Sequence, residues 1–186
     1  MSATEVGSES PAGELPRRWL VMGGSGAGKS TFSREMAEIL ELPVIHLDQS
    51  YWKPGWVQPT REEWRERVAQ LAAGEQWVID GNYSSTLRLR LPRTEAVVLL
   101  DLPTWQCFYG IWSRALRQRA KTRPDMADGC DERWPDPQFM WWVISYKWRS
   151  RPKVLRMIAA APHVRLHHLR SRRAARAFLD GLSGKT

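Results

Sequence analysis

A glycine-rich segment at 23–31, Gly-Gly-Ser-Gly-Ala-Gly-Lys-Ser-Thr, restricts the folds open to this chain more than any other feature. A short apolar run at 17–22 precedes it, and residues 30–40 carry apolar side chains at helical spacing directly after it. Glycines permit the positive φ angles that turn successive backbone N–H groups toward one point, and the first turn of a helix adds further N–H donors. Strand, loop and helix together therefore predict a cradle for phosphate groups.

The segment fits the P-loop pattern G-x-x-x-x-G-K-[ST], in which each residue type has a task. We predict that the loop binds ATP through Gly23, Gly24, Ser25, Gly26, Ala27, Gly28, Lys29, Ser30 and Thr31. Lys29 is expected to reach the β- and γ-phosphates and to act in catalysis, and Ser30 to offer its hydroxyl to Mg²⁺. ATP and Mg²⁺ are thus the predicted cofactors.

Four further apolar runs, at 43–47, 77–80, 96–101 and 163–169, alternate with helical patterns. The helices are expected at 30–40, 60–73, 102–120, 138–147, 152–160 and 172–182, and Thr60 with Glu63 forms a capping box at the start of the second. Such alternation predicts right-handed βαβ units, and hence a three-layer α/β fold whose five-stranded parallel sheet is covered on both faces.

The length of 186 residues, with 42% hydrophobic and 26% charged residues, suits one globular domain. We interpret residues 1–16, which lack Lys and Arg, as a flexible tail rather than a signal peptide, and 17–186 as the domain. No apolar run approaches the roughly 18–20 residues of a membrane span. Cys107 and Cys130 have no metal-binding spacing and are expected as reduced thiols. We therefore expect a cytoplasmic monomer or homodimer without a membrane partner.

The net charge of +8 is unevenly distributed along the chain. Residues 1–109 hold 11 Lys and Arg against 14 Asp and Glu, whereas residues 110–186 hold 17 against 6. A basic C-terminal half fits solvated helix surfaces and fits a phosphate-bearing ligand equally well. Nucleic acid is a weaker alternative, because the sequence contains no recognisable DNA-reading element such as a helix-turn-helix.

Acidic residues end three of the predicted strands, at the edge where open parallel sheets bind ligands: Asp48, Asp80 and Asp101. For Asp101, which precedes Leu-Pro, capping of the following helix is an equally good alternative. Asp48 is suited to take the proton from an acceptor hydroxyl as general base, and the alternative is an Asp that merely starts a turn. Asp80 is a Walker-B-like carboxylate that we expect to hold Mg²⁺ through water. His46, alone within an apolar strand, is expected to be a hydrogen-bonded core residue rather than a metal ligand.

Aromatic residues follow Asp48 in a segment whose Pro54 and Gly55 argue against regular structure. Tyr51 and Trp52 are suited there to stacking on a flat acceptor such as a nucleobase. For Trp56 the same role and core packing are both open. The remaining tryptophans lie in helix or strand patterns and are expected in the core or between helices.

Four segments resemble the bacterial "DNA topology modulation" proteins: IHLDQSYWKPGW (45–56), VIDGNYSSTLRLRL (78–91), TRPDMADGCDERW (122–134) and HLRSRRAARAFL (168–179). The resemblance extends from about residue 19 to 180. Members of this family are adenylate-kinase-like P-loop proteins, grouped by fold with small-molecule and nucleoside kinases. Their name reflects a genetic association with DNA supercoiling, and it leaves the phosphoryl acceptor unidentified.

The resemblance also implies roles for several side chains. An Arg-rich helical lid is implied at about 114–137, in which we choose Arg119 and Arg123 as catalytic. In adenylate-kinase-like folds a substrate-contacting Arg follows the Asp-Gly turn after strand three. Here Asn82 and Tyr83 follow that turn, and Arg88 comes only later, so an uncharged alcohol is as good an acceptor as a monophosphate. These three residues are taken as substrate-binding.

The run after the fifth strand lies where such proteins hold adenine. Arg172 and Arg173 are implied to stack on the base, and the alternative is a charged helix start. Together these features predict an ATP- and Mg²⁺-dependent phosphotransferase acting on a small, nucleoside- or nucleotide-like acceptor. The alternative is a nucleotide-dependent, DNA-associated regulator or ATPase without a small-molecule acceptor.

Overall fold

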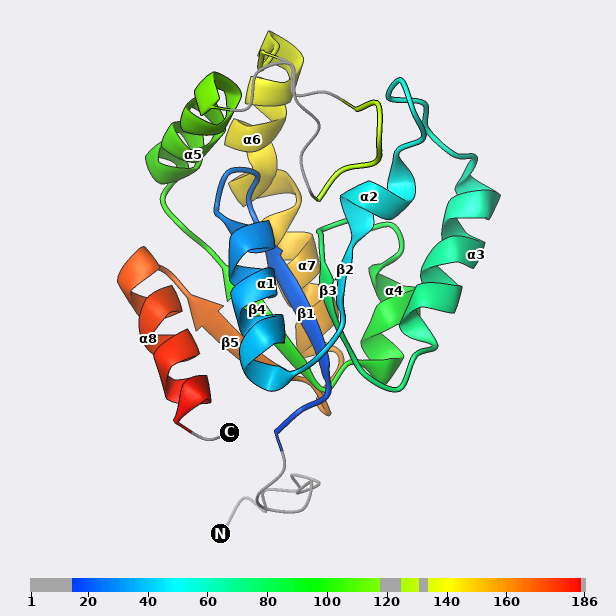
Figure 1. The fold of residues 1–186 in the computed structure, drawn as a ribbon, viewed down its shortest axis with the longest axis vertical. Coiled ribbons are helices and arrows are strands. Elements are labelled where there is room, and N and C mark those ends of the chain that lie inside the picture. Colours follow the sequence, from blue (N-terminus) through cyan, green and yellow to red (C-terminus); the bar gives the residue numbers. More distant parts are fainter. Residues whose placement is uncertain (1–14, 118–124, 131–133, 185–186) are drawn as a thin grey trace, which may run out of the picture.

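Five parallel strands form one sheet in the order β2-β3-β1-β4-β5 (Figure 1). The computed structural model describes residues 15–117, 125–130 and 134–184. The strands are β1 (Arg18–Gly23), β2 (Val44–His46), β3 (Trp77–Asp80), β4 (Ala96–Leu100) and β5 (Arg165–Leu169). The predicted α/β fold with a five-stranded parallel sheet is confirmed.

Helices follow the strands as the apolar spacing predicted, with ends that differ by a few residues. They are α1 (Lys29–Leu40), α2 (Leu47–Tyr51), α3 (Arg61–Ala72), α4 (Leu87–Arg90), α5 (Thr104–Arg117), α6 (Pro137–Arg149), α7 (Arg151–Ala159) and α8 (Arg172–Ser183), with a 3₁₀ turn η1 at Leu91–Arg93. The capping box of Thr60 and Glu63 at the start of α3 is confirmed. The short elements α2, α4 and η1 were not predicted, because three to five residues are too few to show a helical period.

The two faces of the sheet are covered by different helices. Side chains alternate along each strand. Val21 and Val98 therefore belong to one buried cluster, with α1 and α8, while Leu20 and Leu99 belong to another, with α3, α4 and α7. All five residues of β4 are buried, as its unbroken apolar run predicted. Burial on both faces makes β1 and β4 the centre of the domain.

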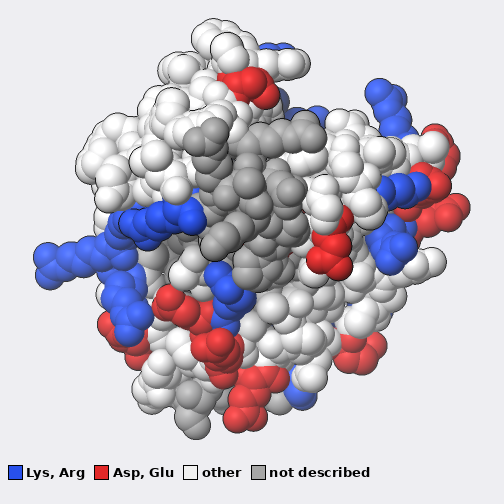
Figure 2. Space-filling view, turned by 45° about the horizontal axis from the view of Figure 1, so that its top comes forward, with Lys and Arg blue, Asp and Glu red and all other residues white. Residues whose placement is uncertain are grey.

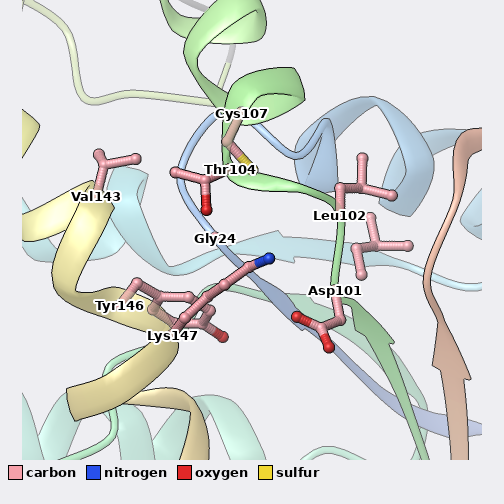
Figure 3. Close-up of a pocket in the computed structure, with 9 residues that line it drawn as sticks. Gly24, Asp101, Leu102, Thr104, Cys107, Val143, Tyr146 and Lys147 are labelled. Atoms are coloured by element: carbon pink, nitrogen blue, oxygen red, sulfur yellow. The ribbon is translucent and has the colours of Figure 1, made fainter.

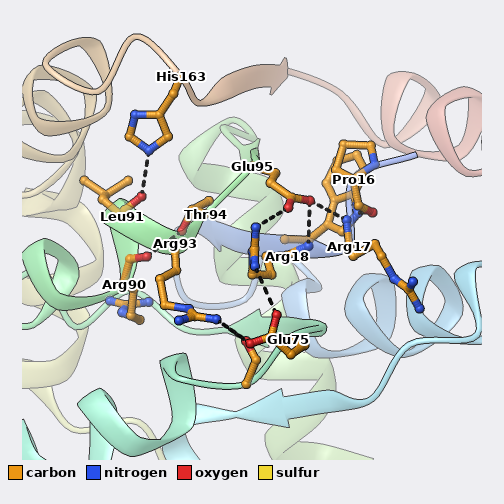
Figure 4. Close-up of polar contacts among 12 residues, drawn as sticks. Pro16, Arg17, Arg18, Glu75, Arg90, Leu91, Arg93, Thr94, Glu95 and His163 are labelled. Carbon is orange, nitrogen blue, oxygen red and sulfur yellow. Dashed lines mark hydrogen bonds and ion pairs between the residues drawn. The ribbon is translucent and has the colours of Figure 1, made fainter. Parts of the chain in front are cut away.

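The sheet order brings three connections together at the carboxyl ends of the strands. β1 pairs with β3, and β3 pairs with β2, so the segments that follow Gly23, Asp80 and His46 leave the sheet side by side. At the opposite end, Glu95 accepts hydrogen bonds from the backbone N–H and the guanidinium of Arg18, and Glu75 pairs with Arg93 (Figure 4). Ion pairs thus occupy the amino edge, and the ligand-binding edge is the other one.

One boundary prediction is wrong in a way that matters for the site. The second strand was expected to reach Leu47, but it ends at His46, and Leu47 begins α2. Leu47 is fully buried there and lies so close to Gly81 that a Cβ on that glycine would meet it at 2.9 Å. Tyr51 closes this helix, so it does not lie in irregular structure as expected. Asp48 is consequently placed by a helical turn rather than by the end of a strand.

The tryptophans are less buried than predicted. Trp19, Trp64 and Trp77 lie in the core, but six of the described tryptophans are exposed: Trp105, Trp112, Trp134, Trp141, Trp142 and Trp148. Figure 2 turns the carboxyl edge of the sheet forward and shows that the upper left surface, where α5 lies, is almost without charged side chains. Among the described residues, no helix combines the length and apolar character needed to cross a bilayer.

The predicted lid lies partly outside the described residues. Arg114 and Arg117 belong to the last turns of α5. Residues 125–130 form turns, in agreement with the loop that the prolines and acidic residues of 121–137 predict. Arg119 and Arg123, the predicted catalytic arginines, lie outside the residues that the structure describes.

Candidate functional site

The loop between β1 and α1 has the geometry that its glycines predicted. Gly23, Gly26 and Gly28 have φ angles of 151°, 78° and 86°, a region that side chains disfavour. Gly28 caps α1 without a side-chain hydrogen bond, and the first turn of α1 contains no acidic residue. The Lys29 ammonium donates to the carbonyl of Gly24 at 3.2 Å, so it lies over the loop. A helix N-terminus built in this way fits a polyphosphate.

Helix α5 supports the loop from behind. A Cβ at Gly26 would lie 2.1 Å from the carbonyl oxygen of Cys107, and one at Gly110 would lie 2.2 Å from the carbonyl oxygen of Gly26. The space behind Gly24, between α5 and α6, is about 10 Å³, and Asp101 and Tyr146 line it (Figure 3). That is room for about one water molecule. The ligand side of the loop is therefore its outer face.

The segment after β3 connects this loop to Asp48. The Asn82 side chain accepts from the N–H of Gly23 at 3.0 Å and donates to its carbonyl at 2.6 Å. The next residue, Tyr83, donates its hydroxyl to Asp48 Oδ1 at 2.7 Å. Two consecutive residues thus hold the first glycine of the P-loop and the candidate general base. The P-loop and Asp48 are therefore both attached to the short connection that follows β3.

Arg90, which the sequence analysis did not single out, holds this connection from below. Its side chain is fully buried and donates to the carbonyls of Gly81, Asn82 and Tyr83 at 3.1, 2.7 and 3.1 Å. Burial lowers the pKa of Arg90 to about 9, so the guanidinium remains charged at neutral pH. Arg88, the predicted substrate residue, is exposed on α4. The pattern Leu-Arg-Leu-Arg contains no signal that tells the two arginines apart.

Tyr83 remains a hydrogen-bond donor to Asp48 at neutral pH. Burial, followed by the negative charge of Asp48, raises the pKa of Tyr83 far above its usual value. The phenol therefore stays protonated and stabilises the charged form of the Asp48 carboxylate. An Asp held in this way keeps a defined orientation, which a general base needs.

Asp80 lies deeper in the site than Asp48. It is 5% exposed, and its Oδ2 atom lies 3.0 Å from Nδ1 of His46. The expectation that His46 is a hydrogen-bonded core residue is confirmed. Within the described part of the chain, Asp80 Oδ1 is buried without a hydrogen-bond partner. A buried carboxylate oxygen of this kind fits a water of Mg²⁺, as predicted for Asp80.

A second carboxylate, missed by the sequence analysis, reaches the P-loop. Ser30 Oγ donates to Asp125 Oδ2 at 2.7 Å, and Asp125 is 8% exposed. The motif TRPDMADGCDERW contains this residue, but its position 95 residues after Ser30 gave no sign of the contact. Among the described residues, no group of three His, Cys, Asp or Glu side chains gathers to hold a metal alone. A cation bound here would therefore need hydroxyl, phosphate and water oxygens among its ligands.

The aromatic residues after Asp48 form a cluster rather than separate stacking surfaces. The Tyr51 ring lies 4.8 Å from Tyr83 and 4.9 Å from Trp64, and Trp52 lies 5.2 Å from Trp56. Tyr51 and Trp52 also line a groove of about 600 Å³ between α2 and α3. Trp56 has a φ of 65°, which a bulky residue adopts only under constraint. Tyr51 therefore has a packing role whatever it binds.

The predicted adenine-side arginines follow β5 at the carboxyl edge of the sheet, the edge at which the P-loop also lies. Arg172 and Arg173 are exposed in the first turn of α8. Ser171 accepts from the N–H of Ala174 and caps that helix. This environment agrees with a charged helix start and leaves their contact with a base as a prediction.

No protein-family model matches the chain, and no curated protein matches it in sequence. Several solved structures are similar in fold. A shikimate kinase from Acinetobacter baumannii, in complex with shikimate, is 18% identical, with a TM-score of 0.56 over 90% of each chain. A shikimate kinase from Bacteroides thetaiotaomicron is 18% identical over 91% of this chain and 98% of that one, with a TM-score of 0.49. A gluconokinase from Sinorhizobium meliloti 1021 is 17% identical over 91% and 94%, with a TM-score of 0.47.

The first of these similarities shows that the chain has the fold of P-loop kinases of this kind. Identities below one fifth show a common fold and carry no substrate from one protein to another. The resemblance to the topology modulation proteins remains a prediction.

Proposed function

We propose that the protein is an ATP- and Mg²⁺-dependent phosphotransferase that moves the γ-phosphoryl group to a hydroxyl of a small acceptor. The observation that carries the proposal is the connection of Gly23 to Asp48 through Asn82 and Tyr83. A P-loop alone binds nucleotide. Here Asn82 holds the first glycine of the P-loop, and the next residue, Tyr83, orients the Asp48 carboxylate. A P-loop joined in this way to a carboxylate is suited to phosphoryl transfer.

The nucleotide side supports the proposal through its donors. The backbone of 23–28 and the N-terminus of α1 would hold the phosphates, with Lys29 beside them. Ser30 and Asp80 would hold Mg²⁺, the first directly and the second through water. ATP·Mg²⁺ supplies the electrophilic phosphorus when it is bound. The chain's own contribution is to position that phosphorus and to neutralise its charge.

The acceptor side supports it through Asp48. Its carboxylate is oriented by the hydroxyl of Tyr83, and it is suited to accept the proton of the attacking alcohol. Trp52 and Trp56 follow Asp48 closely along the chain, and their rings pack against each other. A ring-bearing acceptor that carries a hydroxyl, such as a nucleoside, fits this combination of a base with flat apolar surfaces.

The experiment that tests the proposal measures ADP release from ATP·Mg²⁺ with a panel of acceptors. The panel contains nucleosides, nucleoside monophosphates, sugars, small hydroxy acids and duplex DNA. Stimulation by one small molecule, with one phosphorylated product per ADP, supports the proposal and names the substrate class. Stimulation by DNA alone supports the regulator alternative. Tight ATP binding without turnover under every condition overturns the transferase proposal.

A variant separates acceptor from nucleotide recognition. Trp52→Ala is expected to raise the KM of the acceptor and to leave that of ATP nearly unchanged, because the indole faces no residue of the P-loop among the ring contacts seen. Exposed Trp105→Ala on α5 is the matched control. Equal changes in both KM values would remove Trp52 from acceptor binding.

A further inference from the structure

The contact between Ser30 and Asp125 gives a role to a segment that the proposed function has not used. Ser30 Oγ donates to Asp125 Oδ2 at 2.7 Å, a short and therefore strong bond to a charged acceptor. Ser30 is the residue whose hydroxyl we assign to Mg²⁺. Asp125 belongs to the stretch that follows the predicted lid arginines along the chain. The carboxylate thus reaches the cation's hydroxyl ligand from a distant part of the sequence.

The backbone around Asp125 is anchored to the acceptor side of the cleft. Met126 and Cys130 are 3% and 1% exposed. The carbonyl of Gly129 accepts from the N–H of Gly55 at 3.2 Å, and the Cys130 thiol donates to the carbonyl of Lys53 at 3.4 Å. Residues 125–130 are therefore packed against the loop that follows Trp52. Asp125 is held at Ser30 by this packing as well as by its own hydrogen bond.

The direction of the hydrogen bond suits metal binding. A serine hydroxyl has one proton to donate and two lone pairs to offer. Because the hydroxyl hydrogen of Ser30 points toward Asp125, the lone pairs of its oxygen point away from Asp125 and are available to a cation. A carboxylate that accepts a hydrogen bond from a metal ligand orients that ligand and raises its basicity. Its negative charge also favours a divalent cation over the bare triphosphate.

We propose that Asp125 is a positioning residue of the Mg²⁺ site. Its carboxylate accepts a hydrogen bond from the Ser30 hydroxyl, which turns the lone pairs of the hydroxyl oxygen toward the cation, and it adds negative charge near the cation. The inference rests on the proposed function, because it takes Mg²⁺·nucleotide as the ligand of the P-loop. It goes beyond that function because it makes Mg²⁺ binding depend on residues 125–130. Nucleotide affinity should therefore depend on Mg²⁺ through a pair of residues, Ser30 and Asp125, that acts as a unit.

The test is a set of binding measurements that need no turnover. Isothermal titration calorimetry with a non-hydrolysable ATP analogue, in Mg²⁺ and in EDTA, gives two affinities for each protein. The proteins are the wild type, Asp125→Asn, Ser30→Ala and the double variant. Asp128→Asn is the matched control, because Asp128 lies in the same segment and is exposed.

Asp125→Asn is expected to reduce the gain in affinity from Mg²⁺ by about 10- to 100-fold, the usual loss when an outer partner of a metal ligand is removed. Its affinity in EDTA should be unchanged or higher, because a negative charge near the triphosphate is gone. In the Ser30→Ala background the same substitution should change the Mg²⁺ gain by less than about 3-fold, since the two residues act as one. Asp128→Asn should behave as the wild type.

Each of the following results would overturn the inference. Tighter binding of Asp125→Asn in Mg²⁺ and EDTA alike would identify a contact that blocks the nucleotide. Weaker binding in both, beside a lower melting temperature, would identify a purely structural role. If Asp125→Asn reduced the gain in affinity from Mg²⁺ as strongly in the Ser30→Ala background as in the wild type, Asp125 would act independently of Ser30. If the wild type fails to bind nucleotide at all, the proposed function falls, whereas normal Mg²⁺-dependent binding that Asp125→Asn leaves intact defeats only this inference.

Discussion

The two sides of the candidate site are built from different material. The phosphate side is a continuous stretch, 23–31, whose geometry comes from glycine φ angles and from the start of α1. The acceptor side is assembled from side chains of separate segments, with Tyr83 joined to Asp48 and Arg90 fastened to the backbone of 81–83. Backbone geometry repeats wherever the same residue types recur. A side-chain assembly depends on contacts between distant positions, so it varies from one chain to another, and acceptor specificity is expected to lie there.

The largest effect is expected from Lys29→Ala, which removes the ammonium that lies over the P-loop. The transfer rate should fall by about 10³-fold or more, because charge developing on the phosphoryl group loses its partner. ATP affinity should fall as well. Steady-state kinetics with titration calorimetry measure both. Unchanged turnover would contradict the division into a phosphate side and an acceptor side, because catalysis would not then depend on the P-loop.

Asp48→Asn tests the opposite side. It should lower kcat by roughly 10²–10⁴-fold, the usual contribution of a general base, while the Kd of ATP stays nearly constant. An amide keeps the shape of the carboxylate, so the fold is preserved. Single-turnover kinetics measure the step directly. A variant with the wild-type rate would exclude Asp48 from the mechanism.

Tyr83→Phe sharpens the same point, because it removes only the hydroxyl that Asp48 accepts. A hydrogen bond to a charged group contributes about 1.5–3 kcal/mol, and the variant loses this stabilisation of the charged carboxylate. The acid limb of the pH profile of kcat should therefore move to higher pH, and kcat at neutral pH should change by about 10-fold or less. A limb that stays in place would mean that another group titrates.

The smallest effect is expected from Asn82→Ala, which cuts the link between the two sides. Two hydrogen bonds to Gly23 are lost, each with a net contribution of about 1 kcal/mol. ATP affinity should weaken by about 3- to 10-fold, with a comparable loss in kcat. Calorimetry on Asn82→Ala beside Ser84→Ala, a neighbour in the same connection, measures the difference. A change in acceptor KM alone would place Asn82 entirely on the acceptor side.

The fold was predictable because its signals are local and repeated. Apolar runs such as 96–100 reveal buried strands, and the capping box at Thr60 locates α3 within one residue. The P-loop is of the same kind, since the glycines that shape it are adjacent in sequence. Short elements such as α2 have no period to detect, so the end of β2 was misplaced.

The rest of the site could not be read from the sequence because its decisive contacts join distant residues. Arg88 and Arg90 stand in the same local pattern, and only the burial of α4 against the sheet separates them. Asp125 reaches Ser30 through packing that no spacing encodes. The exposed tryptophans of α5 and α6 show the reverse error, because an apolar residue at helical spacing was taken as buried.

The contact between Gly26 and Gly110 has a consequence for how this protein can evolve. A Cβ at Gly110 would meet the carbonyl of Gly26, and a Cβ at Gly26 would meet the carbonyl of Cys107 on the same helix, so a substitution at either glycine requires α5 to move. A compensating second change is excluded too, because both sites are already at the smallest possible residue. The distance between the P-loop and α5 is therefore expected to stay constant among related sequences. Descendants of this sequence can vary the acceptor pocket freely, but they must do so around a nucleotide cradle whose backing cannot drift.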